Sequence, residues 1–460
     1  MSAAAAAPGV RETAAAVRAR RLTAVDAAKA ALTRIEALNP KLNAYRVVMA
    51  DRALAQAAAV DAAIAAGRDP GPLAGVPFGV KDLFDVAGLP TAAGSKIGLE
   101  NAPAVRDAVL VERLRAAGAV LLGVQVMDEY AYGFTTENAH YGAVRNPHDL
   151  ARSAGGSSGG SAAATAAGLG AFALGSDTNG SIRVPASFCG IFGLKPTFGR
   201  LPRTGTFPFV HDLDHLGPFA RSAGDLALVY QAMRGWDAAD PSCVPDPPEP
   251  APAPDAPLRV AVLDGWFHDM AGPAARQAVA AVAEALGART RVFLPSAETA
   301  RSAAFLITAA SGANLHRANL RARPGDFDPA TRGRLLAGGL LPADALLQAQ
   351  RLRRIAYEEA LALFADYDLL LAPATPIPAP RLGEAETQIG GRLMPTRPNL
   401  GVLAQPISAI GLPVVTVPVR GGALPLGVQL IARPWAEDLA LAAAARLEAA
   451  GLSVSPVKEP

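Results

Sequence analysis

The chain of 460 residues is long enough for one large α/β domain or for two or three domains of average size. Apolar residues make up 51% of it and charged residues 18%, which excludes a disordered or fibrous protein. The formal net charge is +2 and there is no run of basic residues, so we expect no nucleic-acid partner.

Two cysteines, Cys189 and Cys243, are too few for a disulfide framework. Residues 1–21 lack the apolar core of a secretory signal. The uncharged stretch 153–176 is too rich in glycine and serine for a membrane span. We therefore expect a cytoplasmic protein with no membrane contact, no metal and no organic cofactor.

The first part of the chain predicts helices. Residues 10–67 place Ala, Val and Leu at helical spacing, with a break expected at Asn39–Pro40. From 73 to 199, short β-branched runs at 76–80 and 119–122 alternate with glycine-rich turns and helices. This alternation predicts βα units around a mainly parallel sheet.

A proline-rich segment, 241–257, cannot join a helix or a central strand. It is either a linker between domains or a strap across the surface of one domain, and the strap is favoured because the same pattern resumes after it. Later strands are expected at 258–263, 291–294, 369–372, 413–419 and 426–431, and helices at 272–286, 342–364 and 437–450. The fold class is α/β: one α/β/α domain over 1–460, with N-terminal helices in 1–67 and a mixed, mostly parallel central sheet.

Two turns rich in glycine and serine carry the strongest functional signal: GGSSGGS at 155–161 and GSDTNGS at 175–181. Glycine clusters cost conformational entropy, which suits places where the backbone must approach another group closely. A flexible linker is the alternative for the first turn, but the uncharged stretch and the second turn that follow argue against it. Serines and free N–H groups at a helix start favour an anion or oxyanion site.

Two familiar motifs fit this region poorly. Residues 155–159 match G-x-S-x-G, but a nucleophile elbow should follow an apolar strand, and the polar segment 145–154 precedes it. A phosphate-binding loop would need a Lys-Ser or Lys-Thr after the glycines, and none is present.

A serine nucleophile needs a base, and Lys81 is a candidate. It ends the buried strand pattern 75–80, and burial lowers a lysine pKa by disfavouring the charged form. An exposed strand end is the other interpretation of a lone lysine at this position.

Three segments together resemble the hallmark segments of the amidase signature family, and the similarity extends over nearly the whole chain. They are GVPFGVKDLFDVAG at 75–88, AGGSSGGSAAATAAG at 154–168 and LGSDTNGSIRVPASFCGIFGLKPTFGR at 174–200. In that family a serine nucleophile is deprotonated through a second serine, held by a cis peptide bond, which a neutral lysine activates.

The resemblance implies a role for each matching residue. The nucleophile position falls on Ser181, the bridging cis-serine on Ser157 and the lysine on Lys81. The implied oxyanion hole consists of the backbone N–H groups of Thr178, Asn179, Gly180 and Ser181. We expect Ser158 to support the loop by hydrogen bonding, and Asp177 and Arg183 to form a structural ion pair.

Departures from the commonest family pattern resemble one branch. Asn179 stands where many members carry glycine, and Ala154 where many carry proline. With segments such as MDEYAYGFTTENAHYG at 127–142, they resemble the branch that contains the carboxybiuret hydrolase of bacterial s-triazine breakdown. That resemblance implies a small helical companion subunit and a homodimer core.

The substrate pocket is less defined by sequence. Tyr132 and Phe134, in a glycine-containing loop, are candidates for its wall, with ordinary core aromatics as the alternative. His316 is a further candidate for substrate binding, although a structural role is favoured for it, as for His211 and His215.

The sequence therefore predicts a hydrolase that cleaves a C–N bond of a small linear amide or ureide, similar to carboxybiuret, through an acyl-serine intermediate. Two alternatives stay open. One is the glutaminase (A) subunit of a tRNA-dependent amidotransferase, which shares the motifs. The other is a non-catalytic scaffold that has kept the fold.

Overall fold

The computed structural model describes residues 7–245, 258–420 and 422–460. Most of the proline-rich segment 241–257 lies outside the described residues. Whether it is a strap or a linker therefore stays a prediction.

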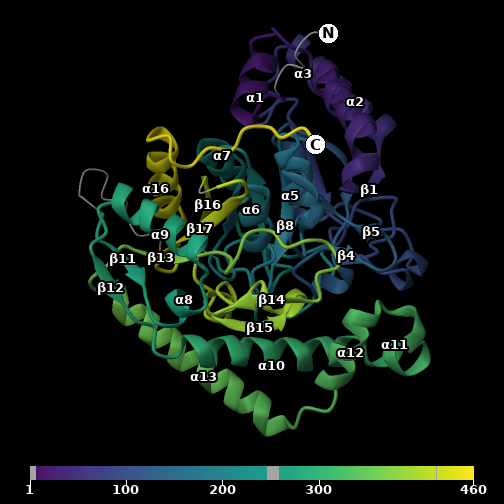
Figure 1. Cartoon of the computed structure of the whole chain (residues 1–460). Coiled ribbons are helices and arrows are strands. Elements are labelled where there is room, and N and C mark those ends of the chain that lie inside the picture. The colour runs from purple at the N-terminus through teal and green to yellow at the C-terminus, as the bar shows by residue number, and fades with distance from the viewer. Residues whose placement is uncertain (1–6, 246–257, 421) are drawn as a thin grey trace.

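One large mixed sheet runs through the molecule, with helices on both sides (Figure 1). Its eleven strands, in spatial order, are β1 (Tyr45–Val48), β3 (Val120–Gln125), β2 (Pro77–Lys81), β8 (Phe172–Asp177), β10 (His215–Ala220), β9 (Phe192–Lys195), β16 (Val414–Arg420), β17 (Pro425–Ala432), β13 (Leu369–Pro373), β11 (Val260–Leu263) and β12 (Thr290–Val292).

The expected mixed α/β sheet is confirmed, but the expectation that most of its strands pair in parallel is wrong. Strand β2 pairs in parallel with β3 and β8, and β11 with β12 and β13, whereas the other neighbouring pairs of this sheet are antiparallel. The βα pattern of the sequence is present in β8, the following helix and β9. A later strand, β10, lies between β8 and β9 and is antiparallel to both. Local alternation cannot reveal such an insertion, because it specifies the order of elements and not their neighbours.

Helices and short elements surround this sheet. The α-helices are α1 (Val10–Arg18), α2 (Ala24–Leu42), α3 (Ala50–Ala65), α4 (Val109–Ala116), α5 (Gly159–Ala166), α6 (Arg183–Cys189), α7 (Ala223–Met233), α8 (Trp266–Asp269), α9 (Pro273–Ala285), α10 (Ala297–Leu315), α11 (Arg317–Ala322), α12 (Pro329–Gly338), α13 (Ala343–Leu363), α14 (Thr396–Asn399), α15 (Gln405–Ala409) and α16 (Glu437–Ala449). Short 3-10 helices and two-stranded ladders complete the fold: η1 (Ile97–Glu100), η2 (Glu129–Ala131), η3 (Pro324–Asp326), β4 (Glu137–Asn138) with β5 (Gly142–Ala143), β6 (Arg145–Asn146) with β7 (Asp149–Ser153), and β14 (Glu386–Ile389) with β15 (Arg392–Pro395).

Strand β3 shows how the sheet divides two cores. Val120 and Leu122 pack with the alanine-rich faces of α2 and α5. Leu121, between them in sequence, belongs to a second cluster, which also includes residues of α4 and α7. Successive side chains of a strand point to opposite faces, so both faces of β3 are buried. The run of apolar residues at 119–122 follows from this burial.

The helical N-terminal region differs from the sequence expectation at two points. Helix α2 does not break at Asn39–Pro40 but continues to Leu42, where Asn43 in the left-handed conformation ends it. Pro40 lies in the last turn, so it removes one intrahelical hydrogen bond near the helix end, and only two helical residues follow it. Residues Tyr45–Val48, expected within the helical region, form the edge strand β1.

The strands and helices expected after residue 257 are present, with ends close to the expected ones. Helix α10 was not predicted. It lies with α13 along one edge of the molecule, opposite α1–α3 (Figure 1). Its many alanines leave no marked apolar stripe, so its periodicity is weak.

Candidate active site

Lys81 is the last residue of β2, a strand whose residues are all buried. Neighbouring strands β3 and β8 cover it on both sides, and its side chain is 0% exposed. The alternative interpretation of Lys81, as an exposed strand end, is therefore wrong. The Nζ atom lies 2.6 Å from Ser157 Oγ and 2.8 Å from Ser176 Oγ.

Burial lowers the pKa of Lys81 from its ordinary value near 10.5 to about 7. The negative charges of Asp128, Asp177 and Asp214 act in the opposite direction but are outweighed by desolvation. A large fraction of this amine is therefore neutral at neutral pH. A neutral amine beside a serine hydroxyl can accept that hydroxyl's proton.

Ser157 lies in the loop that leads into α5, and its peptide bond with Gly156 is cis. Glycine is required at 156, since a Cβ atom there would lie 2.2 Å from Asp128 Oδ2. Asp128 holds the loop from the other side, because its N–H donates to the Ser157 carbonyl at 3.2 Å. As expected, Ser158 supports the loop: its hydroxyl donates to the Ser176 carbonyl at 3.1 Å.

Ser181 lies in the tight turn between β8 and α6, and a buried carboxylate organises this turn. Asp177 accepts the Gly180 N–H at 2.7 Å and the Ile182 N–H at 3.2 Å. Gly180 has φ of +124°, a conformation that favours glycine. Ser181 stands between these two anchored residues and is 2% exposed.

The expected ion pair of Asp177 and Arg183 is present, with both side chains fully buried and 2.9 Å between Arg183 Nε and Asp177 Oδ2. Burial alone would raise the pKa of Asp177, but the charge and hydrogen bonds of Arg183 hold it well below its usual range. Arg183 also donates to the Ala404 carbonyl and to Gln429, so its guanidinium is well satisfied. The pair shapes the turn.

The backbone N–H groups of this turn differ in their availability. Gly180 N–H, expected in an oxyanion hole, already donates to Asp177. Among the residues that the structure describes, the N–H groups of Thr178, Asn179 and Ser181 have no protein acceptor. These three can still meet an oxyanion.

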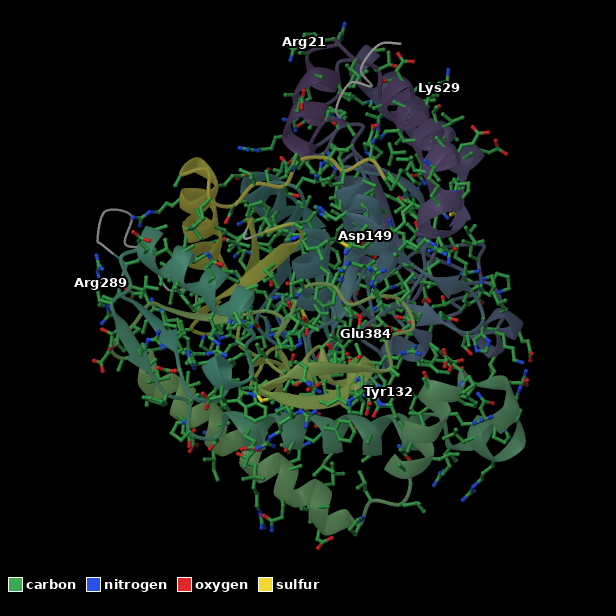
Figure 2. The ribbon with its side chains drawn as sticks, viewed as in Figure 1. Arg21, Lys29, Tyr132, Asp149, Arg289 and Glu384 are labelled. Carbon is green, nitrogen blue, oxygen red and sulfur yellow. The ribbon has the colours of Figure 1, made fainter. Side chains whose placement is uncertain are left out.

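A narrow cavity opens onto Ser181. Of the sequence candidates, Tyr132, Phe134 and Asn179 line it, whereas His316 does not. The other lining residues are Ala131, Gly133, Phe209, Phe305, Thr308, Arg334 and Gln405. Tyr132, labelled in Figure 2, lies on the side of the molecule where α10 and α12 run. These two helices contribute Thr308 and Arg334 to the cavity lining. The free volume is about 10 Å³, the space of roughly one water molecule, so a substrate must displace side chains to enter.

His316 belongs to an aromatic cluster away from the cavity. Its ring lies 3.9 Å from that of Tyr130 and 5.9 Å from those of Phe207 and Phe327. Burial lowers its pKa to about 4. His316 therefore packs as a neutral core residue.

The other histidines give no catalytic or metal site. His211 is exposed, and buried His215 contacts the carbonyl oxygens of Leu213 and Asp177 through Nδ1. The two stand four residues apart, a spacing that also occurs in zinc sites. Within the described part of the chain, no group of three His, Cys, Asp or Glu residues could hold a metal ion.

Several residues around the site were not predicted. Ser176 is in the motif 175–181, but nothing in the sequence pairs it with Lys81. Thr308 and Arg334 reach the cavity from α10 and α12, far along the chain, and neither position carries a recognisable motif. Only the tertiary fold brings these residues together.

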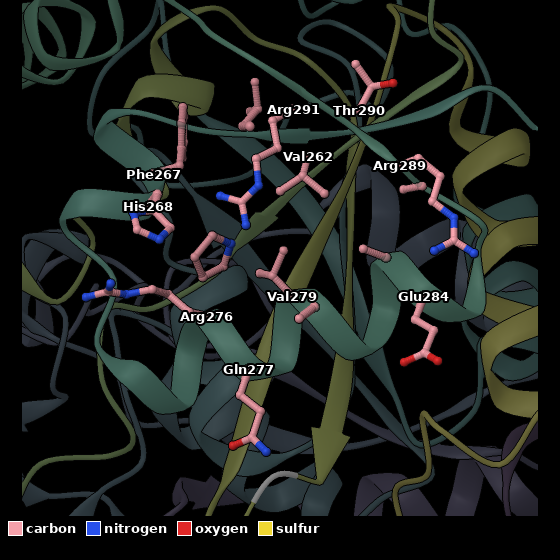
Figure 3. Close-up of a pocket in the computed structure, with 15 residues that line it drawn as sticks. Val262, Phe267, His268, Arg276, Gln277, Val279, Glu284, Arg289, Thr290 and Arg291 are labelled. Carbon is pink, nitrogen blue, oxygen red and sulfur yellow. The ribbon is translucent and has the colours of Figure 1, made fainter.

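A larger cavity of about 530 Å³ lies elsewhere, between α9 and strands β11 and β12 (Figure 3). Arg276, Arg289 and Arg291 line it together with apolar side chains. Its described lining residues include no serine, cysteine or lysine. It is therefore not a second site for the same chemistry.

None of the described helices is long and apolar enough to cross a bilayer. Both cysteines are buried and free, as the low cysteine number suggested.

Comparison with known proteins places the chain among amide-processing enzymes. The Amidase family profile matches residues 26–441. The chain is 52% identical, over 94% of its length and 96% of the relative's, to the 1-carboxybiuret hydrolase subunit AtzE of Pseudomonas sp. (strain ADP). It is 38% identical to the glutamyl-tRNA(Gln) amidotransferase A subunit of Carboxydothermus hydrogenoformans, over 94% and 95% of the two chains.

Solved structures show the same pattern. One is described as a vestigial protein complex that reveals the evolutionary origins of an s-triazine catabolic enzyme. It superposes with a TM-score of 0.95 at 51% identity, over 97% of this chain and 100% of the other. A 6-aminohexanoate cyclic dimer hydrolase complexed with substrate superposes with a TM-score of 0.83 at 29% identity, over 96% and 97% of the two chains.

Proposed function

The chain belongs to the amidase signature family and is a hydrolase acting on amides, and from this premise we propose that it cleaves a C–N bond of a small linear amide or ureide, such as carboxybiuret, with Ser181 as nucleophile. The observation that carries the proposal is the buried contact of 2.6 Å between Lys81 Nζ and Ser157 Oγ. It supports a base that is neutral at working pH and a serine that relays a proton.

The proposed reaction has two halves. Ser181 Oγ attacks the carbonyl carbon, and its proton passes through Ser157 to the lone pair of neutral Lys81. The tetrahedral intermediate then expels the amine or ammonia, which takes the proton back from the relay. Water enters, repeats the proton transfer and releases the acid from acyl-Ser181.

The free N–H groups of Asn179 and Ser181 support oxyanion stabilisation at the start of α6. Such preorganised donors are worth about 10²- to 10³-fold in rate. Thr178 N–H is a third candidate, and Gly180 N–H would have to leave Asp177 to take part.

The substrate is proposed from the relatives. A relative with 52% identity is a 1-carboxybiuret hydrolase subunit, whereas the amidotransferase A subunits are less similar, at 38% identity or close to it. This difference favours a ureide over glutamine. A fold kept as a non-catalytic scaffold is disfavoured because Lys81, Ser157 and Ser181 are all present.

Ser181→Ala should abolish ammonia release from a panel of carboxybiuret, biuret, allophanate, glutamine and simple amides, and should also abolish labelling by a fluorophosphonate probe. Ser161→Ala is a matched control, because Ser161 is equally buried but its hydroxyl donates only to the Leu174 carbonyl, where α5 contacts β8.

Exhaustive chelation of metal ions should leave the rate of amide hydrolysis unchanged. Substantial activity in folded Ser181→Ala would refute the serine mechanism. A rate that is lost on chelation and restored by added zinc would also refute it.

A further inference from the structure

The loop that carries Ser157 is held at both ends by one buried threonine. The Thr136 hydroxyl donates to the Gly155 carbonyl at 2.8 Å and accepts the Gly159 N–H at 3.1 Å. Gly159 lies close against it, since a Cβ atom there would stand 2.5 Å from Thr136 Oγ1. Thr136 therefore fixes the residues on both sides of the segment in which Ser157 contacts Lys81.

Asp128 holds Thr136 and also the middle of the same loop. Its Oδ2 atom accepts the Thr136 N–H at 2.9 Å, and its own N–H donates to the Ser157 carbonyl at 3.2 Å. Its Oδ1 atom accepts from Arg397 of α14 at 3.0 Å, and the residue is 0% exposed. A Cβ atom at Gly156 would lie 2.2 Å from Oδ2, so the carboxylate packs directly against the loop. Two buried side chains thus hold the start, the middle and the end of the loop.

The backbone of Thr136 has a conformation that is unusual for its residue type. Its φ is +51°, in the left-handed region, which is an outlier for a β-branched residue. Such conformations persist where the surroundings over-determine them, and they cluster at functional sites. The hydrogen bond from the Thr136 N–H to Asp128 is one of the contacts that hold it.

Asp128 also acts on Lys81 through its charge. It is the first of three carboxylates whose charge favours the protonated lysine, the others being Asp177 and Asp214. Removal of the Asp128 charge should therefore lower the pKa of Lys81. The charged groups that act on Asp128, or share Arg397 with it, are Arg397 of α14, Arg334 of α12, Glu137 of β4 and Asp328 before α12.

We propose that Asp128 and Thr136 are positioning residues that hold the Ser157 hydroxyl against Lys81 and so keep the proton relay assembled. This inference rests on the proposed function, because it gives both side chains a part in the relay and none in substrate binding. Neither is among the described residues that line the Ser181 cavity. Their replacement should slow the chemical step and leave binding in the cavity unchanged.

The test follows covalent labelling of Ser181 by a neutral fluorophosphonate. Ser181 Oγ forms a bond to phosphorus, the P–F bond breaks and fluoride leaves, while the hydroxyl proton passes through Ser157 to Lys81. Saturation kinetics give a maximal labelling rate and a half-saturating concentration. Both are measured as a function of pH, on either side of the Lys81 pKa of about 7.

Thr136→Val removes the hydroxyl and keeps the shape of the side chain. It should lower the maximal labelling rate about 10- to 100-fold, since a misplacement of reacting groups by about 1 Å costs about 10²-fold. The half-saturating concentration and the midpoint of the pH profile should stay as in the wild type, because no charge is altered.

Two variants control for the loss of a buried hydroxyl. Thr136→Ser keeps the hydroxyl and should keep the wild-type rate. Thr135→Val is the matched control, because the Thr135 hydroxyl is also buried but has no hydrogen-bond partner among the described residues. Its removal should leave the labelling rate unchanged.

Asp128→Asn keeps the size of the side chain and removes its charge. One amide oxygen cannot accept from both Arg397 and the Thr136 N–H, so the maximal labelling rate should fall. The midpoint of the pH profile should also move to lower pH, because Lys81 loses a charge that favours its protonated form. Asp107→Asn, at another buried carboxylate with arginine partners, should change neither quantity.

The outcomes separate this inference from the proposed function. Circular dichroism identifies the folded variants, and either Thr136→Val or Asp128→Asn is sufficient for a decision. A wild-type rate in folded Thr136→Val, an equal loss in Thr135→Val, or an unchanged midpoint in folded Asp128→Asn would overturn the inference, while labelling of wild-type Ser181 would still support the proposed function. Absence of labelling in the wild type would refute the proposed nucleophile and the relay together.

Discussion

Lys81 has unusual chemistry because of its position at the end of a fully buried strand. Free lysine is almost wholly protonated at neutral pH and cannot serve as a base. Desolvation at the end of β2 lowers the pKa to about 7, although three carboxylates oppose the shift. The residue type was visible in the sequence, but the size of the effect depends on the strands that cover it.

The pH dependence of kcat/KM should follow the neutral form of Lys81. The rate should rise as the pH increases through about 7 and level off above it, since the deprotonated amine is the active form. Lys81→Arg should lower kcat/KM by about 10²- to 10⁴-fold, because a guanidinium does not lose its proton.

Lys96→Arg, at a partly exposed lysine paired with Asp326, is the matched control and should be near wild type. Raising the pH should not rescue Lys81→Arg. If Lys81→Arg were active with an unchanged pH profile, Lys81 would act by charge alone, and another base would be needed.

At the scale of elements, the junction of α10 and α11 explains why the His316 ring lies in an aromatic cluster. This residue ends α10, and its ring packs against Tyr130, Phe207 and Phe327. The neutral ring suits that cluster, and burial lowers its pKa to about 4. An unfolded chain would protonate it near 6.5. The folded state therefore loses stability, relative to the unfolded state, as the pH falls from about 6.5 towards 4.

His316→Phe should remove this pH dependence while keeping the packing. Between pH 7.5 and pH 5, the free energy of unfolding of the wild type should fall by about 2 kcal/mol more than that of the variant, at roughly 1.36 kcal/mol per pH unit. Urea denaturation at both pH values measures the change, with the surface variant His268→Phe as control. Amide hydrolysis should persist, and a selective rise in KM without this stability signature would restore His316 as a substrate-binding residue.

For the whole molecule, the sheet brings together residues that lie far apart in the chain. Strand β2 supplies Lys81, the loop before α5 supplies Ser157, and the turn after β8 supplies Ser181. Strands β2 and β8 are direct parallel neighbours, so their ends meet at one edge of the sheet. Helices α10 and α12 then close the cavity from the far part of the sequence.

A short helical companion chain should co-purify with this protein from its native host. The basis is a solved structure at 51% identity that is described as a protein complex, together with the sequence resemblance. Mass spectrometry of the purified assembly would identify the chain, and light scattering would show whether the core is a homodimer. Recovery of tRNA or of a large amidotransferase subunit would instead favour the glutaminase alternative.

Sequence alone determined the local features of this protein. Glycine, serine and lysine at 75–88, 154–168 and 174–200 carried the family resemblance, and the later strands and helices followed from periodicity. It also placed the Asp177–Arg183 pair, because both residues flank one turn. These features are short-range, so neighbouring residues suffice to indicate them.

Tertiary structure decided the contacts between distant segments. It inserted β10 between β8 and β9, paired Ser176 with Lys81, and engaged Gly180 N–H with Asp177. It also brought Arg334 to the Ser181 cavity and kept His316 away from it. Such contacts depend on how elements cross in space, and the periodicity of a single segment carries no information about its partners.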